Sequence, residues 1–149
     1  GPVLEDPRDR QRGGASWPRY SQEVTATLER RPREAVSFAL YGLDDLSLAW
    51  NLAHSLTLDD SMLWQELAKR YEKVEPLAVL PIHIQLVLAD LENAGAGYYR
   101  SAARRLARMR TLASGSAQAD EVDELIADLR ETHRRRPRLQ LEFDKAGLP

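Results

Sequence analysis

The spacing of the apolar residues constrains the fold of this chain more than any other feature. From about residue 20 onward, large apolar side chains recur every three or four positions, as on one face of an α-helix. No stretch shows the sustained alternation of apolar and polar residues that is typical of a β-strand. Prolines and glycines interrupt the pattern where helices begin or end, as at Pro32 for a helix start and at Gly115 and Gly147 for helix stops. The pattern predicts an all-α protein of about eight helices.

Short links join the predicted helices and indicate antiparallel helical hairpins. We expect the helices at about residues 20–31, 32–42, 45–56, 58–74, 84–94, 98–114, 122–132 and 139–146. Such hairpins form either a solenoid that resembles tetratricopeptide repeats or an irregular helix bundle. The predicted pairs start at uneven intervals, near residues 20, 44, 77 and 119, so a true 34-residue tetratricopeptide repeat is not expected.

The first 18 residues lack the helical pattern. They combine glycine, proline, arginine and aspartate without an apolar period, and Gly1-Pro2 resembles the remnant left by a tag-removing protease. We therefore expect a disordered arm over residues 1–18 and a single helical domain over residues 19–149. The remnant also indicates that the chain is one piece of a larger protein.

Composition excludes several classes of protein. Hydrophobic residues make up 43% and charged residues 30% of the chain, which is typical of a globular protein. Because there is no cysteine, disulfides, thiolate catalysis and cysteine-bound zinc are excluded. No uninterrupted apolar run has the length of a membrane span, and no signal-peptide pattern is present. We expect a cytoplasmic protein with no membrane partner.

The C-terminal half resembles a known family. The segments 98–110 and 124–137 resemble the C-terminal helical region of bacterial, actinobacterial-type SWIM zinc-finger family proteins, and the ending 141–148 is also similar to theirs. A looser similarity covers residues 46–67 and 76–91. A SWIM finger needs Cys-x-Cys and Cys-x-His, so the finger itself is lacking here. The resemblance implies a helical region that accompanies a zinc module thought to bind nucleic acid or protein.

Two arginine clusters are candidate phosphate contacts. The first follows one helix at a spacing of about one turn and comprises Arg100, Arg104, Arg105 and Arg108, with Arg110 beside them. The second surrounds the end of the next helix and comprises Arg134, Arg135, Arg136 and Arg138. Arginines in such rows can follow a phosphate backbone. No aromatic residue interleaves with the second cluster, which argues against binding of single strands.

Both clusters also have structural explanations, and for the first cluster we favour the structural one. The helix after the first cluster opens with Asp120, Glu121, Asp123 and Glu124. If the two helices fold back as a hairpin, this acidic end lies beside Arg108 and Arg110 and neutralises their charge. Cations in the last turn of a helix are stabilised by its dipole, which accounts for part of the second cluster. The second cluster remains the best candidate for phosphate contact, because four arginines exceed what a helix end needs.

No residue pattern indicates catalysis. His54, His83 and His133 have no metal-ligand partner three or four positions away, and we expect no metal and no cofactor. The pairs Asp44/Asp45 and Asp59/Asp60 are expected to cap helices, and Thr57 to Asp60 has the spacing of a capping box. Glycine-rich phosphate loops and catalytic motifs are missing from the sequence. We therefore predict no enzymatic activity.

The aromatic residues are candidates for core or for partner contacts. Trp50 is expected in the core, whereas Trp64 and Tyr98 lie off the main apolar stripes of their helices and are candidate exposed anchors for a partner. We predict a non-catalytic protein-interaction domain of a larger bacterial protein, with a protein or other domains of the same chain as partner. The alternative is a nucleic-acid-binding accessory domain that uses the arginine clusters.

Overall fold

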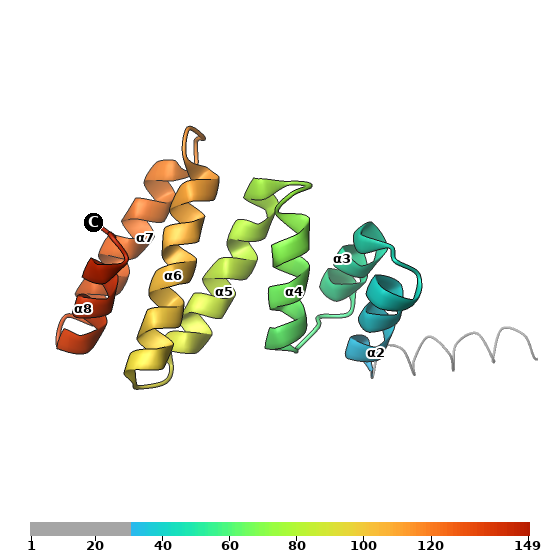
Figure 1. Ribbon diagram of the computed structural model, residues 1–149, viewed down its shortest axis with the longest axis horizontal. Helices are drawn as coiled ribbons and strands as arrows, with labels where there is room; N and C mark the ends of the chain where they lie inside the picture. Colours follow the sequence, from blue (N-terminus) through green and yellow to red (C-terminus); the bar gives the residue numbers. More distant parts are fainter. Residues whose placement is uncertain (1–30) are drawn as a thin grey trace, which may run out of the picture. The chain divides into compact units, whose positions relative to one another are not determined.

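The chain is all-α, as its apolar spacing predicts. The computed structural model describes residues 31–149, and within this range it contains seven α-helices, one π-helical turn, one 3-10 turn and no strand (Figure 1). The arm predicted over residues 1–18 and the helix predicted over residues 20–31 lie outside the described residues. The α-helices are α2 (Pro32–Ser37), α3 (Leu46–Ser55), α4 (Ser61–Tyr71), α5 (Leu80–Leu91), α6 (Ala96–Ala113), α7 (Ala119–Thr132) and α8 (Pro137–Lys145).

The chain divides into two compact units, and the boundary between them falls within α4. The first unit ends at Leu63 and the second begins at Trp64. The single domain over residues 19–149 stays a prediction. Each unit is described by itself below.

In the first unit, α2 and α3 pack against each other. Pro32 occupies the first turn of α2, where its missing N–H removes no helical hydrogen bond. A π-helical turn, Phe38–Gly42, extends α2, and Asp44 then takes a left-handed conformation with φ 50°. Asp45 caps α3, because its Oδ1 atom accepts a hydrogen bond from the Leu48 N–H over 3.0 Å.

The packing between α2 and α3 uses small, aliphatic and aromatic residues. The buried positions are Val36 on α2, Ala39 and Leu40 in the π-helical turn, and Ala49, Trp50 and Ala53 on α3. The prediction that Trp50 is a core residue is confirmed. Leu48 on α3 is partly exposed, so this helix buries one face only, although its sequence is apolar nearly all round.

The cap of α4 differs from the predicted capping box. Thr57 has φ 54°, a left-handed conformation just after α3, so it does not begin α4. Asp60 is the capping residue instead, since its Oδ1 atom accepts a hydrogen bond from the Leu63 N–H over 3.0 Å. The capping role predicted for the aspartates therefore holds for Asp60, and the capping-box assignment of Thr57 is wrong.

In the second unit, successive helices α5, α6 and α7 run antiparallel (Figure 1). A 3-10 turn, Pro76–Val79, leads into α5, and prolines occupy the first turns of α5 and α8. Gly115 and Gly147 follow α6 and α8 with φ 79° and 77°, a conformation that favours glycine at a helix end. Both were predicted as helix stops, and both predictions are confirmed.

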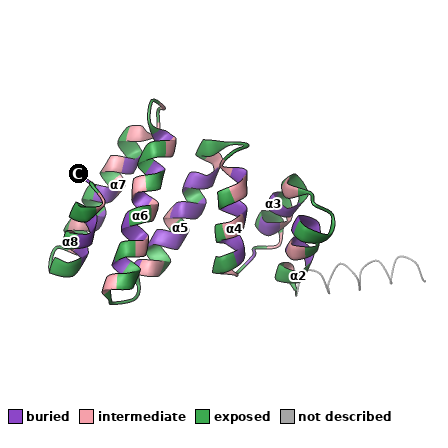
Figure 2. Cartoon of the chain, viewed as in Figure 1, coloured by how far each residue is buried: buried purple, intermediate pink, exposed green. Residues whose placement is uncertain are grey.

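The core of the second unit is built around α6. This helix packs against α5, α7 and α8. The apolar residues that recur every three or four positions in the helix predicted over residues 98–114 are all buried, namely Tyr99, Ala102, Leu106, Met109 and Ala113 (Figure 2). On α8, Leu139 and Phe143 are fully buried in the same core. Because α6 and α8 are not neighbours along the chain, their contact brings together charged residues that the sequence separates.

Candidate functional site

The first arginine cluster divides between several partners. Arg110 pairs with Asp123 of α7, with 2.8 Å between Nε and Oδ1, so the predicted neutralisation across the hairpin is confirmed for this residue. For Arg108 the prediction is wrong, because it pairs with Glu72, just after α4, and its Nε lies 3.4 Å from Oε1. Residues two positions apart project about 200° apart around a helix, so these two arginines face different neighbours.

Arg105 lies between α5 and α6. Its Nη1 donates a hydrogen bond to Nδ1 of the buried His83 over 3.4 Å, and its own Nε atom is shielded from solvent. Burial, followed by the charge of Arg105, lowers the pKa of His83 to about 4, so the imidazole is neutral at pH 7. Arg105 therefore belongs to the packing between α5 and α6.

A buried carboxylate joins α6 to α8. Glu142 is almost fully buried, and its Oε2 atom accepts a hydrogen bond from Arg138 Nε over 3.0 Å. Its Oε1 atom lies 3.6 Å from Nε of Arg100. Burial by itself raises the pKa of Glu142, but the hydrogen bond from Arg138 and the charges of Lys145 and Arg100 outweigh it and lower that pKa. We name Arg100, Arg104, Arg138 and Lys145 the α6–α8 basic surface.

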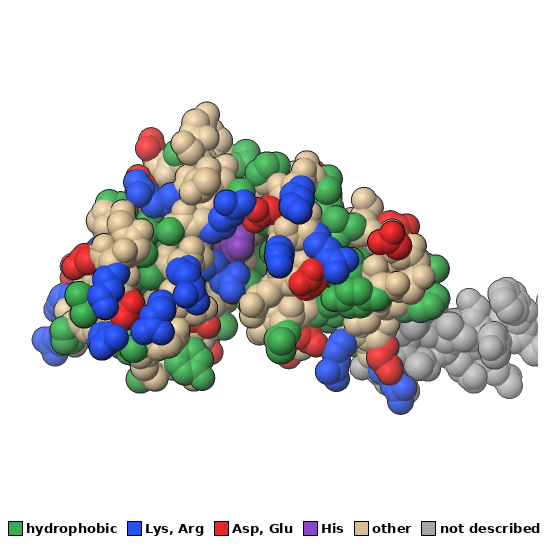
Figure 3. Space-filling model, viewed as in Figure 1, with side chains coloured by type: hydrophobic (Ala, Val, Ile, Leu, Met, Phe, Trp, Pro, Cys, Tyr) green, Lys and Arg blue, Asp and Glu red, His purple; other side chains and the backbone are tan. Residues whose placement is uncertain are grey.

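Sequence reasoning did not single out Glu142 or Lys145. The available signal was the position of Glu142 between Leu139 and Phe143, on the buried side of the last helix, four residues after Arg138. Figure 3 shows Lys and Arg side chains gathered over α6, α7 and α8 on the visible face, with fewer acidic side chains among them.

The second arginine cluster is only partly available to a ligand. Arg134 pairs with Glu131 over 2.5 Å, and both side chains are well exposed. Arg136 donates to the carbonyl of Leu91 over 3.3 Å, and its guanidinium lies 5.9 Å from the ring centre of Tyr99. Arg136 is thus a structural contact. Among the described residues, Arg104 and Arg135 are the members of the two clusters that are exposed and have no ion pair.

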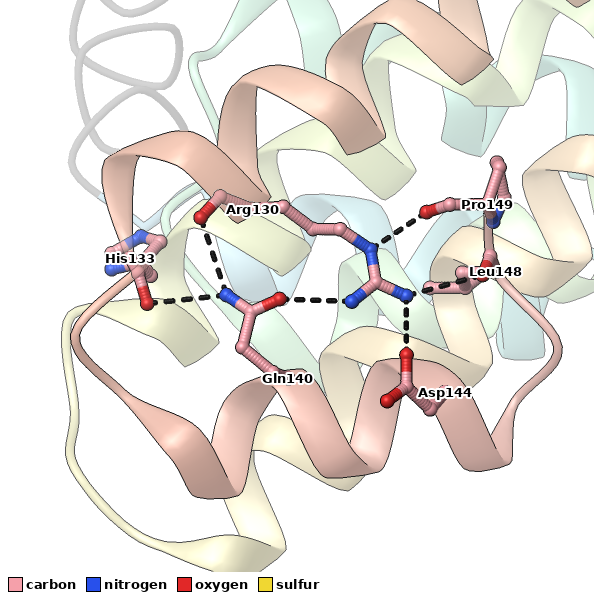
Figure 4. Close-up of polar contacts among 6 residues, drawn as sticks. All are labelled: Arg130, His133, Gln140, Asp144, Leu148 and Pro149. Atoms are coloured by element: carbon pink, nitrogen blue, oxygen red, sulfur yellow. Dashed lines mark hydrogen bonds and ion pairs between the residues drawn. The ribbon is translucent and has the colours of Figure 1, made fainter.

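Arg130 of α7 holds the segment that follows α8, a role that its sequence position did not reveal. Its guanidinium lies 5.5 Å from the ring centre of Phe143. Figure 4 shows its four acceptors, which are Gln140 Oε1 at 2.8 Å, Asp144 Oδ1 at 2.9 Å and the carbonyls of Leu148 and Pro149 at 3.1 and 2.6 Å. Gln140 Nε2 in turn donates to the carbonyls of Arg130 and His133, each over 3.2 Å. This network fixes α8 and its tail on α7.

The two predicted aromatic anchors have different outcomes. Trp64 is only 8% exposed, so the expectation that it is an exposed anchor is wrong. It is buried because α4 has a second apolar line, Trp64 and Ala68, beside the predicted Leu63 and Leu67. Tyr98 is 46% exposed, and its predicted exposure is confirmed. Its role as a partner contact stays a prediction.

Three exposed apolar residues in the first unit went unnoticed in the sequence. Phe38, Tyr41 and Leu43 are each more than half exposed and lie in or next to the π-helical turn. The available signal was that Phe38 and Tyr41 lie off the apolar stripe formed by Val36 and Leu40. These three residues form a candidate contact surface.

The histidines do not converge on a metal site. His54 donates from Nδ1 to the carbonyl of Trp50 over 2.8 Å and packs against its ring, with 4.7 Å between centroids. In the described part of the chain, no three His, Asp or Glu side chains come together as metal ligands. None of the helices in residues 31–149 has the length and apolar character needed to cross a membrane.

Comparisons of the chain with models of known protein families, with curated proteins and with solved structures gave no match. The resemblance to the C-terminal region of SWIM zinc-finger family proteins therefore stays a prediction.

Proposed function

We propose that the chain is a protein-interaction domain of helical hairpins that acts in the cytoplasm and binds a partner protein through the turn after α2. The observation that carries this proposal is the exposure of Phe38, Tyr41 and Leu43, three large apolar side chains within six residues. Contiguous exposed apolar side chains are typical of protein contact sites, and aromatic residues often dominate the binding energy there.

The ring of Phe38 lies close to the backbone of Gly42. A Cβ atom added to Gly42 would come within 2.8 Å of the Cδ1 atom of this ring. Glycine at position 42 therefore permits a close approach of the ring to the backbone. An aromatic side chain that is already positioned loses little conformational freedom on binding, which favours affinity.

The local backbone also supports a functional role. The N–H of Leu43 donates to the carbonyl of Phe38 over 2.9 Å, five residues back, which is the hydrogen bond of a π-helical turn. Such turns are rare and occur often at functional sites. Here the turn widens the helix end and carries two of the exposed aromatic side chains.

The proposed partner is a protein with an apolar groove that accepts the Phe38 ring. Affinity capture on the wild-type chain would identify proteins that bind, and the same capture on Phe38→Ser would show which depend on this ring. Met62→Ser is a matched control, because Met62 is also an exposed apolar residue of the first unit, outside the π-helical turn.

The affinity of each variant is then measured directly with one purified partner whose capture depends on Phe38. We expect Phe38→Ser to weaken its binding at least tenfold and Met62→Ser to change it little. Gly42→Ala should also weaken binding, because the added methyl displaces the ring without removing it. Equal affinities for the wild type, Phe38→Ser and Gly42→Ala would refute the proposal.

A further inference from the structure

The α6–α8 basic surface holds more positive charge than its buried carboxylate neutralises. Arg100 and Arg138 both contact Glu142, and Lys145 lies exposed on the same helix as Glu142, two turns after Arg138. One carboxylate thus faces three cations. Since Glu142 is almost fully buried, the negative charge lies beneath the surface while the positive charges remain at it.

Arg100 and Arg138 each contact Glu142 through one edge of the guanidinium group only. Arg100 and Arg138 both approach Glu142 with their Nε atoms, and their side chains are 49% and 51% exposed. A guanidinium has five N–H groups, four of them on its two Nη atoms. The Nη atoms of both residues have no hydrogen-bond partner within residues 31–149. These groups are the ones that bind phosphate oxygens in pairs.

Arg104 extends the surface along α6. It lies one helical turn after Arg100, about 6 Å along the helix axis, and is exposed with no ion pair among the described residues. The cations therefore spread over two helices and do not surround a single point. Such a spread fits an extended polyanion better than one isolated phosphate group.

We propose that the α6–α8 basic surface binds the phosphate backbone of a nucleic-acid duplex. The surface residues include no aromatic side chain on which an unpaired base could stack, which favours a duplex over a single strand. Tyr98 is exposed, but it lies two residues before Arg100 and so projects about 200° away around the helix. Contacts to phosphate alone carry no base sequence, so the binding is expected to be independent of sequence. The residues of this surface belong to the second unit, whereas Phe38 belongs to the first.

Fluorescence anisotropy with a labelled DNA duplex of about 20 base pairs, titrated at several salt concentrations, tests the proposal. The wild-type chain should bind, with an affinity that falls steeply as salt increases. Arg104→Gln should weaken binding about threefold to tenfold and lower the slope of the salt dependence by about one. This residue contacts no carboxylate in the described chain, so its replacement should leave the fold unchanged.

Arg110→Gln is the matched control, because it removes the same charge from the same helix. Arg110 is 40% exposed and pairs with Asp123, away from Glu142. Its replacement should leave the affinity within about twofold of the wild type. Arg138→Lys adds a second test, since it keeps the charge but loses the Nη groups and should weaken binding severalfold.

Three outcomes would overturn the proposal. The first is a wild-type chain that does not bind the duplex or binds it without salt dependence. The second is an equal loss of affinity in Arg104→Gln and Arg110→Gln, which indicates an effect of net charge alone. The third is binding of a polyglutamate peptide that depends on Arg104, with no binding of the duplex.

Discussion

The imidazole of His83 and the guanidinium of Arg105 are hydrogen-bonded partners inside the second unit, with 3.4 Å between Nδ1 and Nη1. Two basic groups can share this space only while the imidazole is neutral. The charges around His83 come from Arg105 and Arg108 on α6 and from Glu72 after α4, and Asp90 on α5 acts on Arg105. Glu72 and Arg108 form an ion pair with each other, and both charges act on the pKa of His83.

We predict that this arrangement makes the second unit sensitive to acid. The pKa of His83 is lowered from 6.5 to about 4, so the folded state favours the neutral imidazole. The stabilisation is complete above pH 6.5 and is lost as the pH falls from 6.5 to 4, by about 3 kcal/mol. Urea unfolding of the wild type and His83→Gln from pH 7 to 4 measures this loss, and identical pH dependence in the two proteins would contradict the prediction.

Removal of the Arg130 side chain should destabilise the second unit. Arg130→Met loses four hydrogen bonds and the contact with Phe143, which we expect to cost about 2–3 kcal/mol. Arg134→Met is the control, because its exposed pair with Glu131 is expected to contribute less than about 1 kcal/mol. Chemical unfolding of both variants compares the two effects. Equal losses of stability would show that the hydrogen bonds of Arg130 in Figure 4 stabilise the unit no more than an exposed ion pair does.

The core position of Phe143 predicts a large effect of truncation. Phe143 is fully buried, so Phe143→Ala should lower the free energy of unfolding by about 3–5 kcal/mol. Its neighbour Leu141 is 44% exposed, and Leu141→Ala should cost less than about 1 kcal/mol. Thermal and urea unfolding of the pair checks the prediction, which fails if the two substitutions have similar effects.

The cap of α4 can be tested by comparing two adjacent aspartates. Asp60→Ala removes the acceptor for the Leu63 N–H and should destabilise the protein by about 1 kcal/mol. Asp59→Ala removes the same charge from the preceding residue and is expected to have a smaller effect. Unfolding measurements on both variants compare the loss of the Asp60 contacts, which are the capping hydrogen bond and an exposed ion pair with Arg33 at 3.7 Å, with the loss of a charge alone. A larger loss for Asp59→Ala would contradict the assignment of Asp60 as the cap.

Features set by neighbouring residues could be predicted from the sequence. Pro32 begins a helix, Gly115 and Gly147 end helices, and the stripe from Tyr99 to Ala113 is buried, because these features depend on local backbone conformation and helical spacing. The pair Arg110–Asp123 could also be predicted, since adjacent antiparallel helices bring its members together.

Contacts between distant segments could not be predicted in this way. Arg108 and Glu72 are 36 residues apart, and nothing in the spacing of α6 indicates that the residue after α4 supplies its partner. The contact between Arg100 and Glu142 depends on the packing of α8 against α6, and α7 separates these two helices along the chain. Burial of Trp64 likewise depends on the width of the packed face of α4, which one apolar stripe does not reveal.

The position of α8 on α6 has a consequence for synthesis of the protein on the ribosome. Leu139, Phe143 and Leu148 belong to the same buried cluster as Leu106 and Met109 of α6. Until α8 has left the ribosome, this part of α6 has an uncovered apolar surface, although its hairpin with α7 can already form. In the interval between the emergence of α7 and that of α8, the nascent chain therefore exposes apolar surface that favours aggregation and chaperone binding.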